Sequence, residues 1–254
     1  MSLRISATEK LILEGLRKHG ALHLSIIDPG KFRLAEIKKI AEKAVASGTD
    51  LIAVGGTTGI IDLDSKVKVI KKVTNLPVIC YPSNVWSYSK YADAVFFMNL
   101  LNSRQIYYLS GQSILAAPLV HDFGIDVIPV AYLLFEPGKT AGWISDAHLL
   151  PRDNPDAAVA CALAGQYLGA HILFIDAGSG SDFPIPCNII RRIRAKLSIP
   201  IIVGGGIRTK QQAAEAIEEG ADIVCTGYAL ENNKNIQDIC DAIKRQGEKN
   251  KNRI

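Results

Sequence analysis

The sequence lacks the features that would assign it to a membrane, to export or to a metal-binding module. No run of apolar residues approaches the ~18 needed to cross a bilayer. The first twenty residues carry charges throughout and contain no apolar signal-peptide core. The five cysteines are widely spaced without a CxxC pair, and the five histidines show no metal-ligand spacing. We therefore expect a cytoplasmic protein whose cysteines are reduced thiols.

The chain also lacks a concentrated basic tract. Its 29 Lys and Arg against 25 Asp and Glu give a net charge of +4. That balance suits an anionic small substrate and does not favour a nucleic-acid partner. The 48% hydrophobic and 21% charged residues exclude wholesale disorder. The 254 residues match the length of one (β/α)₈ barrel, which has roughly 250.

Short apolar runs alternate with helical patterns along the chain. Eight runs rich in Val and Ile are too short for helices and are typical of buried parallel strands. They cover residues 23–27, 51–54, 78–80, 94–97, 127–134, 172–175, 201–203 and 223–225. Helical patterns cover residues 33–47, 156–168 and 209–219. This alternation predicts an α/β fold, a single (β/α)₈ barrel over residues 1–254, with a frayed tail at 247–254.

Two connections depart from that alternation. Residues 81–93 contain Pro82 and a cluster of Ser, Asn and Tyr, so an irregular segment is expected in place of the barrel's third helix. The missing helix favours an apolar groove beside Trp86, Tyr88 and Tyr91, although these side chains could simply cap apolar surface. Residues 135–155 form a long loop rich in Pro and Gly, and long loops on a barrel are usually functional.

Glycine loops follow three of the predicted strands near the end of the chain. Gly204 and Gly205 follow the seventh strand and Gly227 follows the eighth, where barrels usually bind phosphate through backbone N–H groups. Another loop, residues 176–181, follows the sixth strand. Because these strand ends open on one face of a barrel, we expect the loops to bind one phosphorylated ligand. Asp176 could be a turn residue or a general base.

Two oxygen-bearing side chains follow the first two strands. Asp28 begins a DPGK stretch at the end of the first strand, and Thr57 lies in the glycine loop 55–59 after the second. Mg²⁺ takes a few carboxylate or hydroxyl oxygens together with substrate phosphate oxygens. Asp28 and Thr57 are therefore candidate ligands, although a plain turn explains the first stretch equally well.

In order along the chain, these stretches resemble one enzyme family. The motifs are LSIIDPGK (24–31), VGGTTG (54–59), LLNS (100–103), AYLLFEPG (131–138), FIDAGSG (174–180), VGGGIR (203–208) and TGYA (226–229). Together they resemble the archaeal geranylgeranylglyceryl phosphate synthases and, more distantly, the bacterial heptaprenylglyceryl phosphate synthases. The resemblance implies a prenyltransferase that uses Mg²⁺ to join a prenyl diphosphate to the free hydroxyl of sn-glycerol 1-phosphate. Diphosphate is released, and the product carries the first ether bond of archaeal membrane lipids.

The resemblance also implies roles for individual residues. It makes Asp28 and Thr57 the metal ligands. The position of Asp176 at the end of the sixth strand, beside the expected glycerol phosphate, predicts that it is the catalytic base. The glycerol-phosphate pocket would consist of Phe174, Ile175, Asp176, Ala177, Gly178, Ser179, Gly180, Gly204, Gly205, Gly227 and Tyr228. The expected groove beside the missing helix would then hold the prenyl chain, lined by Trp86, Tyr88, Tyr91 and Tyr132. The resemblance further implies a homo-oligomer and peripheral membrane contact for product release.

The motifs depart from the family pattern at three places, and two other functions stay open. The family usually has YLEAGSG where this chain has FIDAGSG, GN where Gly227 and Tyr228 stand, and DPDK where residues 28–31 read DPGK. One alternative is another phosphate-binding barrel enzyme, a sugar-phosphate isomerase or lyase. Such enzymes need a Lys or a pair of acids at strand ends, and a strand-end Lys is lacking here. The other alternative is a non-catalytic prenyl-phosphate binding protein.

Overall fold

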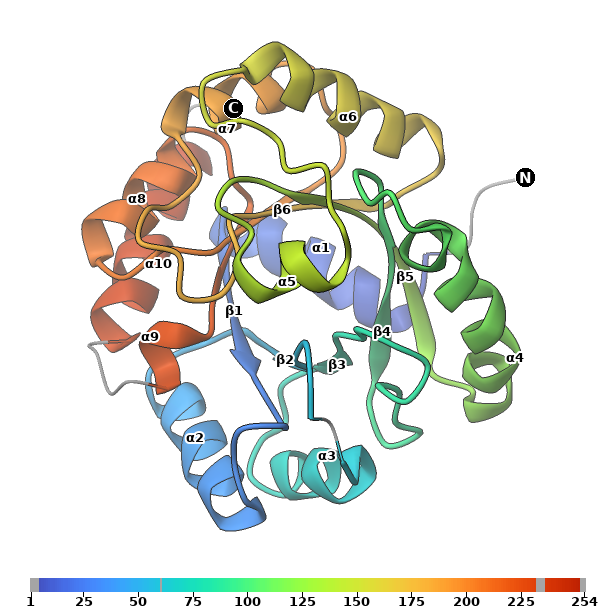
Figure 1. Ribbon diagram of the computed structural model, residues 1–254. Helices are drawn as coiled ribbons and strands as arrows, with labels where there is room; N and C mark the ends of the chain where they lie inside the picture. The colour runs from blue at the N-terminus through green and yellow to red at the C-terminus, as the bar shows by residue number, and fades with distance from the viewer. Residues whose placement is uncertain (1–4, 60, 232–235, 252–254) are drawn as a thin grey trace.

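The eight predicted strands close into a barrel. In the computed structural model, which describes residues 5–59, 61–231 and 236–251, neighbouring strands pair in parallel in chain order, and β8 pairs with β1 (Figure 1). The strands are β1 (Leu22–Ile27), β2 (Leu51–Val54), β3 (Val78–Cys80), β4 (Ala94–Leu100), β5 (Asp126–Leu134), β6 (Ile172–Asp176), β7 (Ile201–Gly204) and β8 (Ile223–Thr226). They are mostly apolar because both faces of a closed parallel sheet are covered, although β1 also contains His23 and Ser25.

Helices surround the barrel, and two more lie across its ends (Figure 1). The outer elements are α2 (Leu34–Ala46), α3 (Leu63–Lys71), the π-helical turn η1 (Tyr107–Gly111), α4 (Gln112–Phe123), α6 (Pro155–Tyr167), α7 (Cys187–Arg194), α8 (Lys210–Glu218), α9 (Tyr228–Glu231) and α10 (Ile236–Lys251). Helix α1 (Ala7–His19) lies across the N-terminal end, where Ile12 joins the apolar side chains inside the barrel. Helix α5 (Lys139–Ile144) lies over the opposite end, and Ala141 packs on the same interior.

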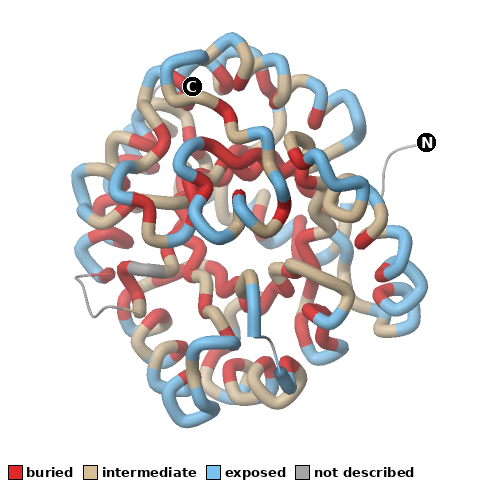
Figure 2. Tube along the Cα trace, in the orientation of Figure 1, coloured by how far each residue is buried: buried red, intermediate tan, exposed pale blue. Residues whose placement is uncertain are grey.

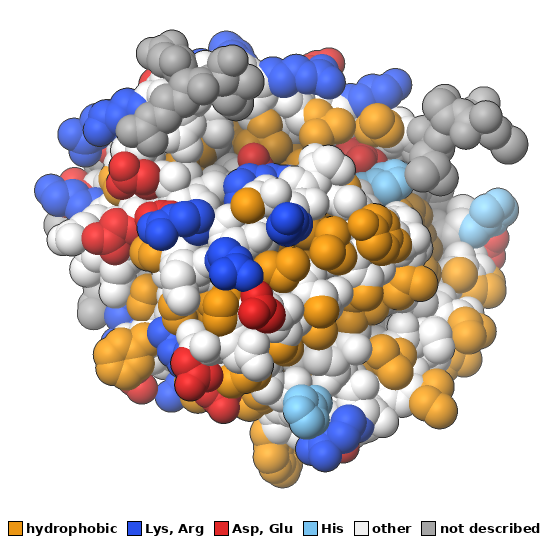
Figure 3. Space-filling model, turned by 90° about the horizontal axis from the view of Figure 1, so that it is seen from above, with side chains coloured by type: hydrophobic (Ala, Val, Ile, Leu, Met, Phe, Trp, Pro, Cys, Tyr) orange, Lys and Arg blue, Asp and Glu red, His pale blue; other side chains and the backbone are white. Residues whose placement is uncertain are grey.

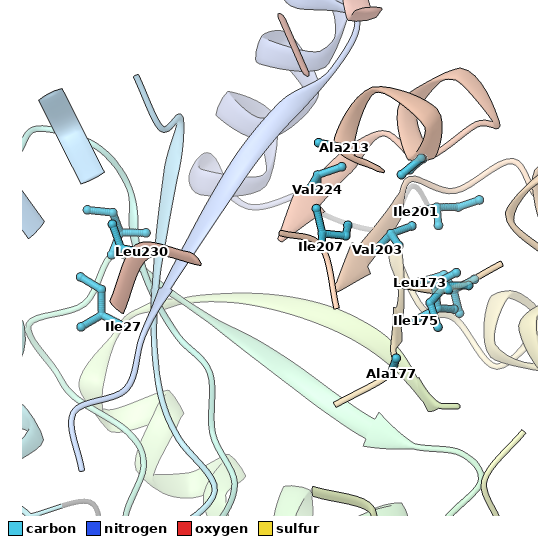
Figure 4. Close-up of a cluster of buried hydrophobic side chains, with 14 of the residues drawn as sticks. Ile27, Leu173, Ile175, Ala177, Ile201, Val203, Ile207, Ala213, Val224 and Leu230 are labelled. Carbon is cyan, nitrogen blue, oxygen red and sulfur yellow. The ribbon is translucent and has the colours of Figure 1, made fainter. Parts of the chain in front are cut away.

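Side chains of each strand alternate between two apolar layers. On β6, Leu173 and Ile175 point outward into the layer between barrel and helices, part of which Figure 4 shows. Ile172 and Phe174 point into the barrel. Buried residues follow the strands, whereas the outward sides of the helices are exposed (Figure 2). Because the side-chain period of a strand is two, Asp176 also faces the barrel interior.

Most of the predicted elements are confirmed. The eight strands and the three predicted helices agree with the structure to within three residues at each end. Residues 81–93, all of them described, contain no helix, so the irregular segment between β3 and β4 is confirmed. The five cysteines are free thiols, as expected. Within the described residues, no helix combines the length and apolar character that crossing a membrane requires.

Two local predictions need correction. The long loop 135–155 contains a short helix, α5, which its Pro and Gly content concealed. The frayed tail is wrong for residues 247–251, which form the last turns of α10. Gly247 packs so closely on the end of α1 that an added Cβ would lie 2.5 Å from the carbonyl oxygen of His19. The polar sequence of residues 247–254 does not predict this contact, because Gly247 and His19 are more than two hundred residues apart.

Candidate active site

A cavity of about 310 Å³ opens at the C-terminal end of the barrel. Residues at or just beyond the ends of all eight strands line it, and α5 contributes Thr140, Ala141 and Ile144, with Ser145 directly after the helix. The barrel places these residues together because parallel strands present all their carboxyl ends on one face. The other lining residues are Ile26, Asp28, Lys31, Gly55, Gly56, Thr57, Thr58, Tyr81, Pro82, Ser83, Met98, Leu100, Tyr108, Gln112, Tyr132, Leu134, Phe174, Asp176, Ser179, Gly180, Gly204, Gly205, Gly206, Ile207, Cys225, Gly227 and Glu231.

Asp176 is held in this cavity by two hydrogen bonds. The hydroxyl of Tyr132 donates to Oδ2 at 2.7 Å, and the backbone N–H of Gly178 donates to Oδ1 at 2.8 Å. Burial raises the pKa of Asp176, and the two hydrogen bonds offset part of that rise because they favour the carboxylate. Gly205 lies against the same oxygen, since an added Cβ there would be 2.5 Å from Oδ1. The result is an oriented carboxylate suited to accept a proton.

Three aromatic rings pack beside this carboxylate. The Tyr81 ring lies 6.1 Å from that of Tyr132 and 5.7 Å from that of Phe174, and the last two are 5.3 Å apart. Sequence reasoning did not assign Tyr81 a role. The available signal was its position, the first residue after β3 and therefore at the functional face of the barrel.

Asp28 lies at the rim of the cavity in a cluster of charges. The ammonium group of Lys31 is 3.5 Å from Asp28 Oδ2 and 3.1 Å from Glu231 Oε2. Burial lowers the pKa of Lys31, but the hydrogen bond and charge of Glu231, together with Asp28, raise it overall. The sequence did not predict that Glu231 lines the cavity, because this residue belongs to the short helix α9 and not to a strand end.

The Asp28 region offers hard oxygen ligands of the kind that Mg²⁺ prefers. Thr57 lines the same cavity, and Gly56 passes so close that an added Cβ would lie 2.1 Å from Asp28 Oδ1. Among the described residues, no group of three or more His, Cys, Asp and Glu could hold a metal alone. These residues therefore fit an ion that completes its shell with water and substrate phosphate oxygens.

The glycine loops contribute to the cavity unequally. Ser179, Gly180, Gly204, Gly205 and Gly227 line it. Arg208 steadies the first of these loops by donating to the carbonyl oxygens of Gly180 and Ser181 at 3.2 and 2.7 Å.

Three residues predicted for the glycerol-phosphate pocket do not line the cavity. Ile175 and Ala177 point into the outer apolar layer (Figure 4), as the alternation of β6 requires. The N–H of Gly178 is engaged by Asp176. The backbone of Tyr228 begins α9, but its side chain lies outside the described part of the structure.

The aromatic side chains proposed for the groove are also placed differently. Tyr132 lines the cavity, whereas Trp86, Tyr88 and Tyr91 do not. Trp86 is 80% exposed, and Tyr88 is buried where its hydroxyl accepts a hydrogen bond from Gln112. These three residues therefore do not line this cavity, and their assignment to a prenyl groove stays a prediction. The apolar wall consists instead of Met98, Leu100, Tyr108 and Ile144.

Comparison with known proteins finds a matching family model, relatives of similar sequence and similar solved structures. The sequence model of the PcrB family matches residues 14–247. The geranylgeranylglyceryl phosphate synthase of Thermococcus gammatolerans is 48% identical over 231 residues, 90% of this chain and 91% of that protein. The crystal structure of (S)-3-O-geranylgeranylglyceryl phosphate synthase from Thermoplasma acidophilum, in complex with its substrate sn-glycerol-1-phosphate, superimposes with a TM-score of 0.90. Its sequence is 39% identical, and the match covers 95% of this chain and all of that one.

Proposed function

This chain belongs to the PcrB family, and from that premise we propose that it transfers a geranylgeranyl group to sn-glycerol 1-phosphate. The observation that carries the proposal is the buried Asp176 carboxylate, which faces the same cavity as the glycine loops and the Asp28 cluster. The relatives that are this similar in sequence, and that align with nearly the whole chain, are named geranylgeranylglyceryl phosphate synthase. Family membership removes the isomerase and lyase alternatives.

The reaction replaces one C–O bond by another. The bond between the allylic carbon and the diphosphate breaks, and the acceptor hydroxyl forms an ether bond to the same carbon. The hydroxyl proton passes to Asp176, whose carboxylate is oriented by Tyr132 and Gly178. The loops at Ser179, Gly180, Gly204, Gly205 and Gly227 hold the acceptor phosphate, which makes the encounter of the two substrates an oriented one.

Mg²⁺ is the cofactor in this proposal. Asp28 and Thr57 would hold the ion beside the departing diphosphate, where it supplies charge neutralisation. Lys31 adds a second positive charge at the same rim, since it is 3.5 Å from the Asp28 carboxylate.

The prenyl chain is assigned to the apolar side of the cavity. Met98, Leu100, Tyr108 and Ile144 form this side, between β4, η1 and α5. An apolar wall facing a polar one suits a substrate with a hydrocarbon tail and a diphosphate head.

One assay tests the proposed function. The purified protein is incubated with Mg²⁺, labelled geranylgeranyl diphosphate and either sn-glycerol 1-phosphate or its 3-phosphate enantiomer, and the labelled ether product is quantified. We expect product with the 1-phosphate, much less with the enantiomer, and none after chelation of the metal. An Asp176→Asn variant is the matched control for background solvolysis of the diphosphate. Equal product from both enantiomers, or from the Asn variant, would contradict the proposal.

We also propose a homo-oligomer that works in the cytoplasm and contacts membranes peripherally. Large apolar side chains are exposed on several elements, among them Tyr167 and Leu168 at the end of α6, each 77% exposed. Figure 3 shows the side of the molecule on which α6 lies, where hydrophobic side chains spread across the surface beside Lys and Arg side chains. Light scattering measures the oligomer mass, and flotation with anionic liposomes measures membrane contact.

A further inference from the structure

A polar cluster lies in the apolar layer between the barrel and α10, behind the loop that begins at Gly227. His23 of β1 and Thr226 of β8 belong to it, and both are buried, with 0% and 4% of their surfaces exposed. Their side chains point outward, because the adjacent Leu24 and Cys225 point into the barrel. The ring nitrogen Nε2 of His23 lies 2.9 Å from the hydroxyl oxygen of Thr226. The two neighbouring strands are thus joined by a side-chain hydrogen bond as well as by their backbones.

The contacts of the His23 ring indicate which of its nitrogens carries the hydrogen. Burial lowers the pKa of His23 to about 3, so the ring is neutral and has one N–H group. The Thr49 hydroxyl donates to the carbonyl oxygens of His23 and Leu51, which lie 3.3 and 3.2 Å away. It therefore accepts from the N–H at Nδ1, 2.8 Å away, for which the sulfur of Cys240 at 3.3 Å is a weaker second acceptor. Nε2 is left to accept from the Thr226 hydroxyl, which gives that hydroxyl a fixed direction.

This hydrogen bond lies where β8 is paired on one side only. β7 pairs with β8 as far as Val224, whereas β1 pairs with it as far as Thr226. Gly227 follows directly and lines the cavity, and an added Cβ there would lie 3.4 Å from the carbonyl oxygen of Ile26 on β1. Thr226 and Gly227 share one peptide group. A fixed Thr226 side chain therefore restricts the direction of the Gly227 N–H.

We propose that His23 and Thr226 are positioning residues, which hold the Gly227 N–H in the direction that the acceptor phosphate requires. The inference rests on the proposed function, in which that phosphate is bound at Gly227, and it adds two residues to it. Neither side chain lines the described cavity, so their effect on the acceptor passes through the backbone. A buried network whose polar groups are satisfied specifies one geometry, whereas an apolar replacement would leave the strand end freer to move.

Replacement of Thr226 by Val isolates the hydroxyl, because the branched shape of the side chain remains. Loss of one neutral hydrogen bond predicts a roughly 3- to 10-fold weaker Kd for sn-glycerol 1-phosphate, measured by calorimetry, and a similarly raised KM. The KM for geranylgeranyl diphosphate should stay within about twofold, since that substrate is assigned to the other side of the cavity. Thr226→Ser keeps the hydroxyl and should restore acceptor affinity to within about twofold of the wild type.

Ser25→Ala is the matched control. Ser25 pairs with Thr226 in register, is equally buried, and has a hydroxyl that makes no hydrogen bond within the described part of the chain. Its removal should leave the acceptor Kd unchanged. A loss in Ser25→Ala as large as in Thr226→Val would show a general loosening of the layer and would overturn the inference.

A double-mutant cycle decides whether His23 acts through Thr226. If it does, adding His23→Leu to Thr226→Val causes no further loss of acceptor affinity. A further, multiplicative loss would overturn the inference, as would an unchanged acceptor Kd in Thr226→Val or an equal weakening of both substrates. Thermal unfolding shows that each variant is folded at the temperature of the measurement, and the milder Thr226→Val decides the matter if the double variant is not.

Calorimetry also separates this inference from the proposed function, because acceptor binding is measured without turnover. A wild-type protein that binds sn-glycerol 1-phosphate but forms no ether product would remove the proposed transfer, and the variants alone would then decide the positioning role. A wild-type protein that does not bind the acceptor would overturn both.

Discussion

Replacement of Asp176 by Asn is the most direct test of the chemistry. The amide keeps one oxygen, which can still accept from the Gly178 N–H now bonded to Oδ1 at 2.8 Å. The NH₂ group takes the place of Oδ2, where Tyr132 donates at 2.7 Å. Tyr132 can turn to accept from that group, so the loop and the cavity should keep their shape. What disappears is the ability to take a proton.

The expected loss follows from that single deficit. General base catalysis contributes about 10²–10⁴-fold, so kcat of Asp176→Asn should fall by that factor with a modest change in acceptor affinity. Asp176→Glu, which restores the family's residue, should be tolerated or even improve turnover. Its reach is roughly 1.5 Å longer, about one C–C bond. Single-turnover measurements with saturating prenyl diphosphate separate the chemical step from product release.

The pH dependence supplies an independent readout. Burial raises the pKa of Asp176 from its ordinary value. The wild-type kcat/KM should therefore fall as the pH decreases through that raised pKa, since the protonated carboxyl cannot accept. The Asn variant should lack this acidic limb. Single-turnover rates near those of the wild type, with the limb retained, would show that Asp176 only orders the glycine loop and would refute the reasoning.

Three further perturbations test other parts of the structure. Asp28→Asn should lower turnover by at least ~10²-fold while calorimetry still detects glycerol-phosphate binding, because the carboxylate serves diphosphate departure; near-normal turnover at limiting Mg²⁺ would contradict this. Tyr108→Ala, in the cavity wall, should change prenyl chain-length preference, whereas Trp86→Ala, at an 80% exposed site, should not; identical product profiles would place the chain elsewhere. Burial lowers the pKa of His23 from 6.5 to about 3. Between these two values the imidazole is protonated in the unfolded chain and neutral in the folded one. The free energy of unfolding should accordingly fall by up to about 1.4 kcal/mol per pH unit as the pH drops below 6.5. Urea unfolding of wild type and His23→Gln between pH 4 and 7 measures this, and equal slopes would assign the effect to other groups.

The barrel could be predicted from the sequence because its determinants are local. Runs such as 51–54 and 78–80 are short and apolar throughout, which is typical of strands buried on both faces. The boundaries of α8 follow from Thr209, which caps the helix, and Gly220, which lies beyond its end. The irregular segment followed from Pro82 and its polar neighbours, whose local conformation is set by turn chemistry.

The site could be predicted only where the backbone itself carries the function. Glycine loops and Asp176 have their positions fixed by the strand ends. The packing of Tyr81 on Tyr132 and the ion pair of Lys31 with Glu231 join residues about fifty and two hundred positions apart, respectively. The direction of the 80% exposed Trp86 side chain depends on the turns around it, which the sequence pattern does not determine.

The two carboxylates of the cavity differ in surroundings, and that difference separates their roles. Asp28 lies at the rim with its side chain 16% exposed, beside the Lys31 ammonium and the Gly30 N–H. A carboxylate in such a polar setting can interact with a cation and with water. Asp176 lies deeper, between phenols and glycines, where the carboxylate has exchanged water for two fixed donors. Because desolvation makes a carboxylate a stronger base, we propose that the buried acid takes the proton and that the acid at the rim binds the metal through which the diphosphate is held.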